Sequence, residues 1–312
     1  YFNCWWRNYN KMKFKSKVFL APMADVTDAA FRILCSGYGA GLTYTEMISS
    51  TVLARTGKNK LIDIQKNESP IAIQLMGNNL DDISKAVTLV QDKVDLIDFN
   101  MGCPMKKIVK SGCGVALMRD PPLVKKIVNT LVKSSKKPIS IKIRSGWDNE
   151  NMNALEIAKI AEEEGASMIT IHPKTQSQVR SGNADWSLIR KIKDAISIPV
   201  IGNGEIWHVG DIKKMFSESK CDYVMVGRAA SSNPYIFKQY RDYLKSGKFD
   251  TKKNFDMIQD YLKLAEKYKT NFNYVKGHTI YMSKGVEGAP KLRDQISKTQ
   301  NIKEIKEIIQ PI

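Results

Sequence analysis

Eight short apolar runs alternate with amphipathic stretches over a little more than 200 residues, and this alternation limits the possible fold more than any other feature. Runs of four or five residues rich in Val and Ile predict buried strands. They cover residues 18–21, 42–45, 71–75, 96–100, 139–143, 168–171, 199–202 and 223–226. Helical patterns lie between them, at residues 29–36, 80–90, 122–134, 154–164, 186–195 and 210–217. Eight such units predict an α/β fold of the (β/α)8 TIM-barrel type.

An open, doubly wound parallel sheet is the alternative arrangement of the same elements. Such sheets often carry a glycine-rich fingerprint directly after a strand, where it binds a dinucleotide. The nearest match, Gly37, Gly39 and Gly41, precedes a predicted strand instead of following one. The barrel is therefore favoured.

The strand pattern stops near residue 240. Residues 255–268, 274–283 and 302–309 show helical patterns, and no further strand is predicted among them. We therefore expect three parts, which are a basic and aromatic N-terminal segment (1–17), a catalytic barrel (18–240) and a small C-terminal all-helical domain (241–312).

Polar and small residues come at the end of every predicted strand. In a barrel the carboxyl ends of the strands converge at one mouth, where this fold carries out its chemistry. Any one of these residues could be an ordinary loop residue, but all eight strand ends contribute. The set consists of Pro22, Met23, Ala24, Glu46, Gln74, Asn100, Cys103, Lys142, Arg144, His172, Asn203, Gly204, Glu205, Gly227 and Arg228.

Cys103 lies on the turn after the fourth predicted strand. Gly102 permits a sharp turn, and Pro104 fixes φ and removes a donor, so the thiol is held at a strand end. A free thiol has a pKa near ~8.5 and at neutral pH mostly carries the proton that a general acid must donate. A small, inert core cysteine is the alternative.

Lys142 and Gln74 suit the ring of a flavin. Lys142 could place a positive charge beside an electron-rich ring and stabilise its reduced anion, and Gln74 offers both a donor and an acceptor to a ring edge. A barrel-interior ion pair between Lys142 and Glu46 is the alternative.

Two glycine-containing turns after the last two strands favour a bound anion. Residues 202–204 and 227–228 offer backbone N–H groups where barrels commonly bind phosphate, and Arg228 could pair with phosphate oxygens. The sequence Ser-Asn-Pro at 232–234 predicts the start of a helix beside them.

The net charge of +17 indicates a polyanionic partner. Residues 1–17 hold five cations and no acid, and residues 236–312 hold 16 cations against 9 acids, so most of the excess lies at the two ends. Such patches suit nucleic acid or, less well, an acidic membrane surface. A solvated, lysine-rich surface is the alternative.

The five cysteines are scattered and form no Cys-x-x-Cys pair, which argues against a disulfide framework and against a zinc site, so no metal is expected. This cysteine usage is typical of proteins in a reducing cytoplasm, and we expect a cytoplasmic location. No apolar run reaches the length of a membrane span, and no membrane association is expected.

Six motifs at the expected barrel mouth resemble those of the bacterial-type tRNA-dihydrouridine synthases. They read Ala-Pro-Met-Ala-Asp-Val-Thr-Asp, Asn-Met-Gly-Cys-Pro, Lys-Ile-Arg-Ser-Gly-Trp-Asp, Ala-Asp-Trp, Gly-Asn-Gly and Gly-Arg-Ala-Ala-Ser-Ser-Asn-Pro, at residues 21–28, 100–104, 142–148, 184–186, 202–204 and 227–234. The similarity begins near residue 18 and continues into the helical tail, through 276–278 and 292–293.

The resemblance implies a barrel that binds FMN and a helical domain that holds tRNA, without an obligatory protein partner. It implies that NADPH reduces the flavin, that hydride passes from flavin N5 to C6 of a uracil, and that Cys103 gives a proton to C5. It places FMN against Pro22, Met23, Ala24, Gln74, Lys142, His172, Asn203, Gly204, Glu205, Gly227 and Arg228. The same comparison implies that Asn100 orients the uracil, and we expect the other contacts to tRNA from Arg144, Lys174, Lys276, His278 and Arg293.

The chain departs from the family pattern after the sixth strand. The family usually has His-Gly-Arg-Thr-Arg where residues 172–176 read His-Pro-Lys-Thr-Gln, Arg180 stands in place of a common tyrosine, and Glu205 in place of aspartate. These changes concern the RNA side of the site and the choice of uridine. Two other functions fit the residues, a flavin barrel that reduces a free pyrimidine and a non-catalytic tRNA-binding protein.

Overall fold

The computed structural model describes residues 13–179 and 181–309, so most of the expected N-terminal segment lies outside the described residues, as does Arg180. Eight parallel strands form one sheet in the order β1-β8-β7-β6-β5-β4-β3-β2. They are β1 (Val18–Leu20), β2 (Thr43–Ser49), β3 (Ile71–Met76), β4 (Leu96–Met101), β5 (Ile139–Gly146), β6 (Met168–Thr175), β7 (Val200–Asn203) and β8 (Tyr223–Val226).

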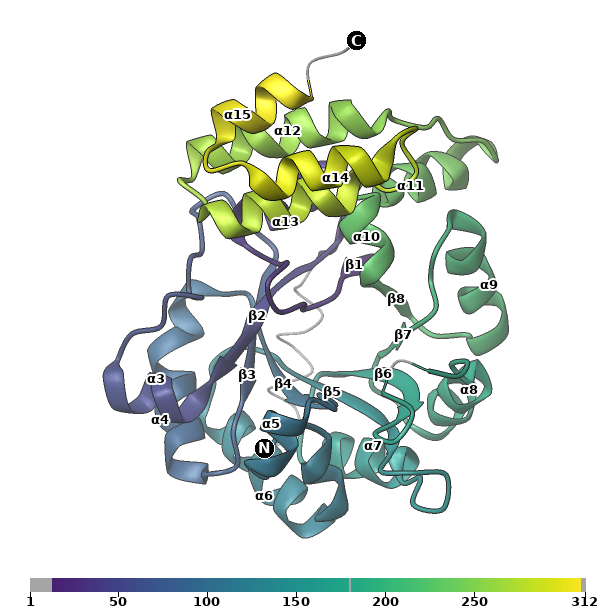
Figure 1. Ribbon diagram of the computed structural model, residues 1–312. Helices are drawn as coiled ribbons and strands as arrows, with labels where there is room; N and C mark the ends of the chain where they lie inside the picture. Colours follow the sequence, from purple (N-terminus) through teal and green to yellow (C-terminus); the bar gives the residue numbers. More distant parts are fainter. Residues whose placement is uncertain (1–12, 180, 310–312) are drawn as a thin grey trace.

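The two edges of this sheet meet between β1 and the start of β2. The Leu20 N–H donates to the Leu42 carbonyl at 2.9 Å, and the Gly41 N–H donates to the Val18 carbonyl at 2.8 Å. The sheet thereby curls into a nearly closed barrel with helices around it (Figure 1). This confirms the predicted TIM-barrel fold.

The helices begin where side chains can satisfy their free backbone donors. Asp28 caps α2, Asn79 caps α4, and Asp120 caps α6 just before its first-turn proline. The helices up to the end of the barrel are α2 (Ala29–Gly37), α3 (Ser50–Thr56), α4 (Leu80–Val90), α5 (Lys106–Lys110), α6 (Pro121–Ser134), α7 (Ala154–Glu163), α8 (Trp186–Ala195), α9 (Val209–Ser219) and α10 (Arg228–Ser232). Two short 310 helices, η1 (Gln91–Lys93) and η2 (Gly114–Arg119), complete this part.

The core has two layers. An outer layer of Ile, Val and Leu side chains lies between the strands and the helices, as in α4, which buries Ile83, Ala86 and Val87. A smaller apolar cluster of Phe19, Tyr44 and other strand residues fills the lower interior of the barrel. Between this cluster and the carboxyl ends of the strands, the interior of the barrel is therefore lined mainly by the polar side chains of the mouth.

Three strands run further toward the mouth than the apolar runs predict. β2 continues to Ser49, β5 to Gly146 and β6 to Thr175. His172, expected just past a strand end, therefore lies inside β6, and Lys142 lies well inside β5. Sheet hydrogen bonds hold these side chains more firmly than a loop would.

The described chain after β8 is helical. Beyond α10 it forms α11 (Ile236–Ser246), α12 (Asn254–Lys267), α13 (Phe272–Met282), α14 (Ala289–Lys298) and α15 (Ile302–Ile308). The last four helices gather in one layer beside the mouth, over β1 and α10 (Figure 1). Helix α12 packs directly on α2.

An aromatic cluster joins this helical layer to the barrel. The ring of His278 on α13 stacks on Phe31 of α2 with 4.3 Å between centroids, and it lies 4.5 Å from the ring of Tyr261 on α12. His278 Nε2 is 2.8 Å from Asp28 Oδ2. The side chain of His278 is only 1% exposed, so tRNA cannot reach it. This corrects the expectation that His278 binds substrate.

Candidate active site at the barrel mouth

A pocket opens at the carboxyl ends of the strands, where the sequence predicts the site. It has an internal volume of about 190 Å³. Strands β1 and β5 to β8, or the turns that follow them, contribute its lining. The lining residues are Ala21, Pro22, Met23, Lys142, His172, Asn203, Gly204, Glu205, Ile206, Trp207, Met225, Gly227 and Arg228. Nine of the eleven residues expected to bind a cofactor are therefore brought together, and Ala24 and Gln74 are outside this lining.

Lys142 reaches across the barrel interior from β5 to β7. Its Nζ donates to Asn203 Oδ1 at 2.9 Å, and Asn203 Nδ2 donates to the Met225 carbonyl at 2.9 Å. Burial lowers the pKa of the Lys142 ammonium, and the Asp98 carboxylate opposes that change. The alternative ion pair between Lys142 and Glu46 does not form, because the Glu46 carboxylate binds other groups.

Glu46 instead ties the helical layer to the rim. It accepts from the Asp25 N–H at 2.6 Å and from the Tyr274 hydroxyl at 2.5 Å. Asp25 has a left-handed φ of 58° in the turn that follows β1. Glu46 therefore holds together a strained turn next to the pocket and helix α13.

The pocket is electropositive. Burial holds the pKa of His172 well below its ordinary value, and neighbouring cations lower it further. These cations are Lys142, Arg144, Lys174 and Arg228. His172 is therefore neutral at pH 7, and the positive charge around it is available to a bound anion.

A glycine after β7 lets the His172 ring lie directly against the backbone of the pocket. Gly204 has a φ of +116°, and a Cβ there would lie 2.7 Å from the His172 ring. At the next strand the Arg228 guanidinium lies over the Trp207 ring, 4.6 Å from its centroid. Exposed backbone at Gly204 and Gly227, together with the cations, fits a flat group that carries a phosphate, such as a flavin.

Cys103 lies on the turn between β4 and α5, and its side chain is partly exposed. The Cys103 N–H donates to Asn100 Oδ1 at 2.9 Å, as does the Gly102 N–H at 3.1 Å. Burial raises the pKa of the thiol, whereas the Met105 N–H and the charges of nearby cations partly offset this rise. The thiol thus keeps its proton at neutral pH.

Gly114 packs against this turn from η2, which suggests a test. Its φ is +64°, and a Cβ there would lie 2.5 Å from the Cys103 carbonyl oxygen. We expect Gly114→Ala to lower the free energy of unfolding by more than about 1 kcal/mol, because alanine is strained at this φ and displaces Cys103. Urea unfolding measures this change. The control is Gly210→Ala, since Gly210 has open space and should not be destabilised; equal stability of both variants would contradict the contact.

Two of the other residues expected to bind substrate are fixed by internal bonds. Arg144 is buried and donates to the carbonyls of Thr175 and Val179 at 2.7 and 2.8 Å, although its Nε has no partner among the described residues. Lys174, with a side chain 1% exposed, pairs with Glu205 at 2.7 Å. This pairing corrects the expectation that Lys174 contacts tRNA.

The remaining expected contacts lie in different surroundings. Lys276 donates to the Ser297 carbonyl at 2.9 Å, which links α13 to α14. Arg293 lies on α14 with a partly exposed side chain. Asn100 is buried and spends its side-chain oxygen on the Cys103 turn. Of these three, Arg293 is the most available to a partner.

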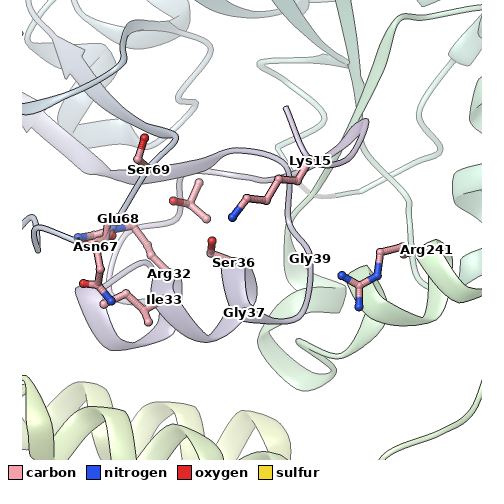
Figure 2. Close-up of a pocket in the computed structure, with 11 residues that line it drawn as sticks. Lys15, Arg32, Ile33, Ser36, Gly37, Gly39, Asn67, Glu68, Ser69 and Arg241 are labelled. Atoms are coloured by element: carbon pink, nitrogen blue, oxygen red, sulfur yellow. Dashed lines mark hydrogen bonds and ion pairs between the residues drawn. The ribbon is translucent and has the colours of Figure 1, made fainter. Parts of the chain in front are cut away.

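A larger cavity, of about 330 Å³, lies at the opposite end of the barrel. Figure 2 shows it between the end of α2 and Lys15, with Arg241 to one side. The buried Arg32–Glu68 ion pair lines it at 2.6 Å. None of the predicted site residues lines this cavity, so size alone does not identify the candidate active site.

The profile of the family described as "Dihydrouridine synthase (Dus)" matches residues 19–311 of this chain. The chain belongs to the dihydrouridine synthase family. It is 43% identical over 227 residues to tRNA-dihydrouridine synthase B of Pasteurella multocida, which covers 72% of this chain and 68% of that one. It is 36% identical over 313 residues to a probable tRNA-dihydrouridine synthase of Rickettsia prowazekii, covering 96% and 94% of the two chains.

A solved structure supports the fold independently of family membership. Morphinone reductase superposes with a TM-score of 0.56 at 11% identity, covering 78% of this chain and 90% of that one. At this identity the likeness concerns the barrel alone.

The described residues contain neither a metal-binding cluster nor a membrane-spanning helix. Within 13–179 and 181–309 there is no cluster of three His, Cys, Asp or Glu side chains able to hold a metal. In the same residues, no helix has the length and apolar composition needed to cross a membrane.

Sequence reasoning overlooked Asp98, Gly114 and Trp207. Asp98 reads as one polar residue inside an apolar strand, and only its pairing with Gln74 shows that it faces the mouth. The turn of Gly114 around Cys103 and the stacking of Trp207 on Arg228 depend on tertiary contacts. An aspartate inside a buried strand was the one available signal, because such a residue must find a polar partner.

Proposed function

We propose that this chain reduces uridine in tRNA to dihydrouridine with FMN bound in the mouth pocket and NADPH as the reductant. The observation that carries the proposal is the position of Cys103 in a member of this family. The protonated thiol stands on the rim next to the cationic group of Lys142 and Arg144. A flavin oxidoreductase that acts on a polyanion needs both an acid at the rim and an anion-binding mouth.

The pocket residues would bind and orient the cofactor. Arg228 and the backbone around Gly204 and Gly227 suit the phosphate, since they combine a guanidinium with exposed N–H groups. Lys142 and Asn203 would face the ring system, where Lys142 would stabilise negative charge. A bound, reduced flavin supplies a hydride.

Cys103 would supply the proton that completes reduction of the uracil double bond. Its half-buried thiol has a raised pKa, so it is protonated at pH 7 and can donate to a carbon next to the site of hydride addition. The Met105 N–H stabilises the thiolate that remains after donation. The target base must leave the tRNA stack to reach the thiol, at a cost of a few kcal/mol, about what binding of tRNA phosphates can offset.

The helical layer would contact tRNA phosphates through exposed lysines. Lys284 and Lys291 are exposed and make no ion pair among the described residues. We expect the double variant Lys284→Ala, Lys291→Ala to weaken tRNA binding and to reduce the slope of log K against log salt by about 1 to 2, since each lost phosphate contact removes about 0.9. Fluorescence titrations at several salt concentrations measure both quantities.

The control for this experiment changes two exposed lysines on the outside of the barrel. Lys85 of α4 and Lys159 of α7 are exposed on helices that lie away from the helical layer. Alanine at both positions should leave affinity and slope unchanged. Equal losses in the two double variants would show that the positive charge acts wherever it lies on the surface, and would contradict a tRNA-binding surface on α14 and the turn that precedes it.

Two measurements separate the proposed activity from the other candidate functions. The purified chain should be yellow with a flavin spectrum, which a tRNA-binding scaffold would lack. After anaerobic reduction, unmodified tRNA should reoxidise the flavin, whereas free uridine should not. Reoxidation by free uridine at a similar rate would favour a pyrimidine reductase and overturn the proposal.

A further inference from the structure

Asp98 is a fully buried carboxylate in β4 that has no part in the proposed chemistry. Its Oδ2 accepts from Gln74 Nε2 at 2.7 Å. Gln74 Oε1 in turn accepts from Asn100 Nδ2 at 3.1 Å. Asn100 Oδ1 accepts from the backbone N–H groups of Gly102 and Cys103. A continuous row of hydrogen bonds therefore leads from Asp98 to the backbone of the cysteine turn.

The two ends of this row fix its direction. Backbone N–H groups only donate, so Asn100 must present its oxygen to the turn and its NH2 group to Gln74. Gln74 must then present its oxygen to Asn100 and its NH2 group to the next partner. That partner must be an acceptor, and an ionised carboxylate is an acceptor only. Only one orientation of the two amides lets Asn100 accept from the Cys103 turn, and in that orientation the NH2 group of Gln74 needs the acceptor that Asp98 provides.

A buried amide that faces the wrong way leaves unpaired donors, and each such group costs about 1–3 kcal/mol. If position 98 could not accept, the NH2 group of Gln74 would have no partner there. Rotation of Gln74 would then turn its NH2 group toward that of Asn100, and rotation of Asn100 would remove the acceptor from the Cys103 turn. Loss of the acceptor at position 98 would therefore weaken the hydrogen bonds that hold the Cys103 turn.

We propose that Asp98 is a positioning residue that holds the Cys103 turn through the amides of Gln74 and Asn100. The inference deepens the proposed function, since Cys103 is the acid of that function. It assigns Asn100 to the support of the turn, with one N–H left over for a ligand. The register of β3 and β4 creates the first link by placing Gln74 beside Asp98.

The charged group that faces Asp98 offers a competing explanation. Lys142 lies close enough for its charge to act on the Asp98 carboxyl, and Asp98 Oδ1 has no hydrogen-bond partner among the described residues. Asp98 could therefore matter only as a counter-charge to Lys142. Two substitutions separate these roles, because Asp98→Asn keeps an acceptor without the charge and Asp98→Leu removes both.

The test follows alkylation of Cys103 by iodoacetamide in the purified full-length chain at pH 7.5. Mass spectrometry of the peptide that carries Cys103 gives its rate separately from the other cysteines. Asp98→Leu should react about tenfold faster. Burial raises the pKa of the Cys103 thiol, and a looser turn would expose the thiol and lower this pKa by about one unit. Asp98→Asn should stay within about twofold of the unaltered chain, and so rescue the leucine phenotype.

Three results would overturn the proposal. They are an unchanged or slower rate in Asp98→Leu, an equal acceleration in Asp98→Asn, and an acceleration in Asp98→Leu that extends equally to Cys113. Should Asp98→Leu not fold, Gln74→Met breaks the same row one step on and must show the same acceleration. Alkylation needs neither tRNA nor reductant, so a failure of the proposed activity would be seen separately, as a chain that forms no dihydrouridine.

Discussion

Cys103→Ala is expected to lower the rate of dihydrouridine formation by about 10²- to 10⁴-fold, the contribution typical of a positioned general acid. Flavin content and tRNA affinity should stay close to those of the unaltered chain. The reason is that the Cys103 side chain does not line the pocket, and the turn is held by its backbone N–H groups. Single-turnover formation of dihydrouridine measures the rate, and the flavin spectrum measures the content.

Cys113 provides the matched control. It is buried beside the same turn, and its thiol points to the Ser111 carbonyl at 3.6 Å. Alanine at position 113 should therefore leave the rate within about twofold of the starting value. A Cys103→Ala chain that forms product at a near-normal rate would remove Cys103 from the mechanism.

The second large effect concerns stability. Arg32 and Glu68 form a buried ion pair at 2.6 Å, with side chains 1% and 2% exposed. Arg32 also donates to the Thr27 carbonyl at 2.7 Å and so anchors the segment that leads into α2. We expect Arg32→Met to lower the free energy of unfolding by about 3–5 kcal/mol, because Glu68 is left as an unpaired buried charge. Urea unfolding at pH 8 measures the loss.

The pH dependence tests the cause. Burial already raises the pKa of Glu68 against the opposing effect of Arg32, and loss of Arg32 must raise it further. A carboxyl whose folded pKa lies above its unfolded value binds protons more readily when folded, so stability rises as pH falls toward 5. The defect of Arg32→Met should thus be smaller at pH 5 than at pH 8. Arg190→Met, which breaks the exposed pair with Asp194, should cost less than about 1 kcal/mol; an equal cost at both sites would contradict the account.

The barrel could be predicted from the sequence because eight short, mostly apolar runs alternate with amphipathic helical patterns along the chain. The observed bounds of β8 equal the predicted ones, and those of β1 differ by one residue. The predicted helix start at 232–234 was wrong, because Asn233 ends the short helix α10 and α11 begins at Ile236. A capping residue and a proline occur at both ends of helices, so the local pattern does not decide between them.

The site could be predicted as a set of positions but not as a network. The expected residues around Lys142 and Arg228 do gather at one pocket, since parallel strands bring their carboxyl ends to one mouth. The sequence did not predict which charged side chains are exposed to a partner, since Lys174 is paired with Glu205 and His278 is stacked on Phe31. A charge in a sequence shows no partner, and a partner that is distant in the sequence, 31 residues away for Lys174 and 250 for His278, decides whether the side chain is free.

The most direct test of the central claim is a mass-spectrometric map of tRNA after incubation with the purified chain and NADPH. We expect specific uridines to gain two hydrogen atoms, and we expect no such gain with Cys103→Ala or without NADPH. Unmodified tRNA from a reaction with the yellow, folded chain would contradict the account.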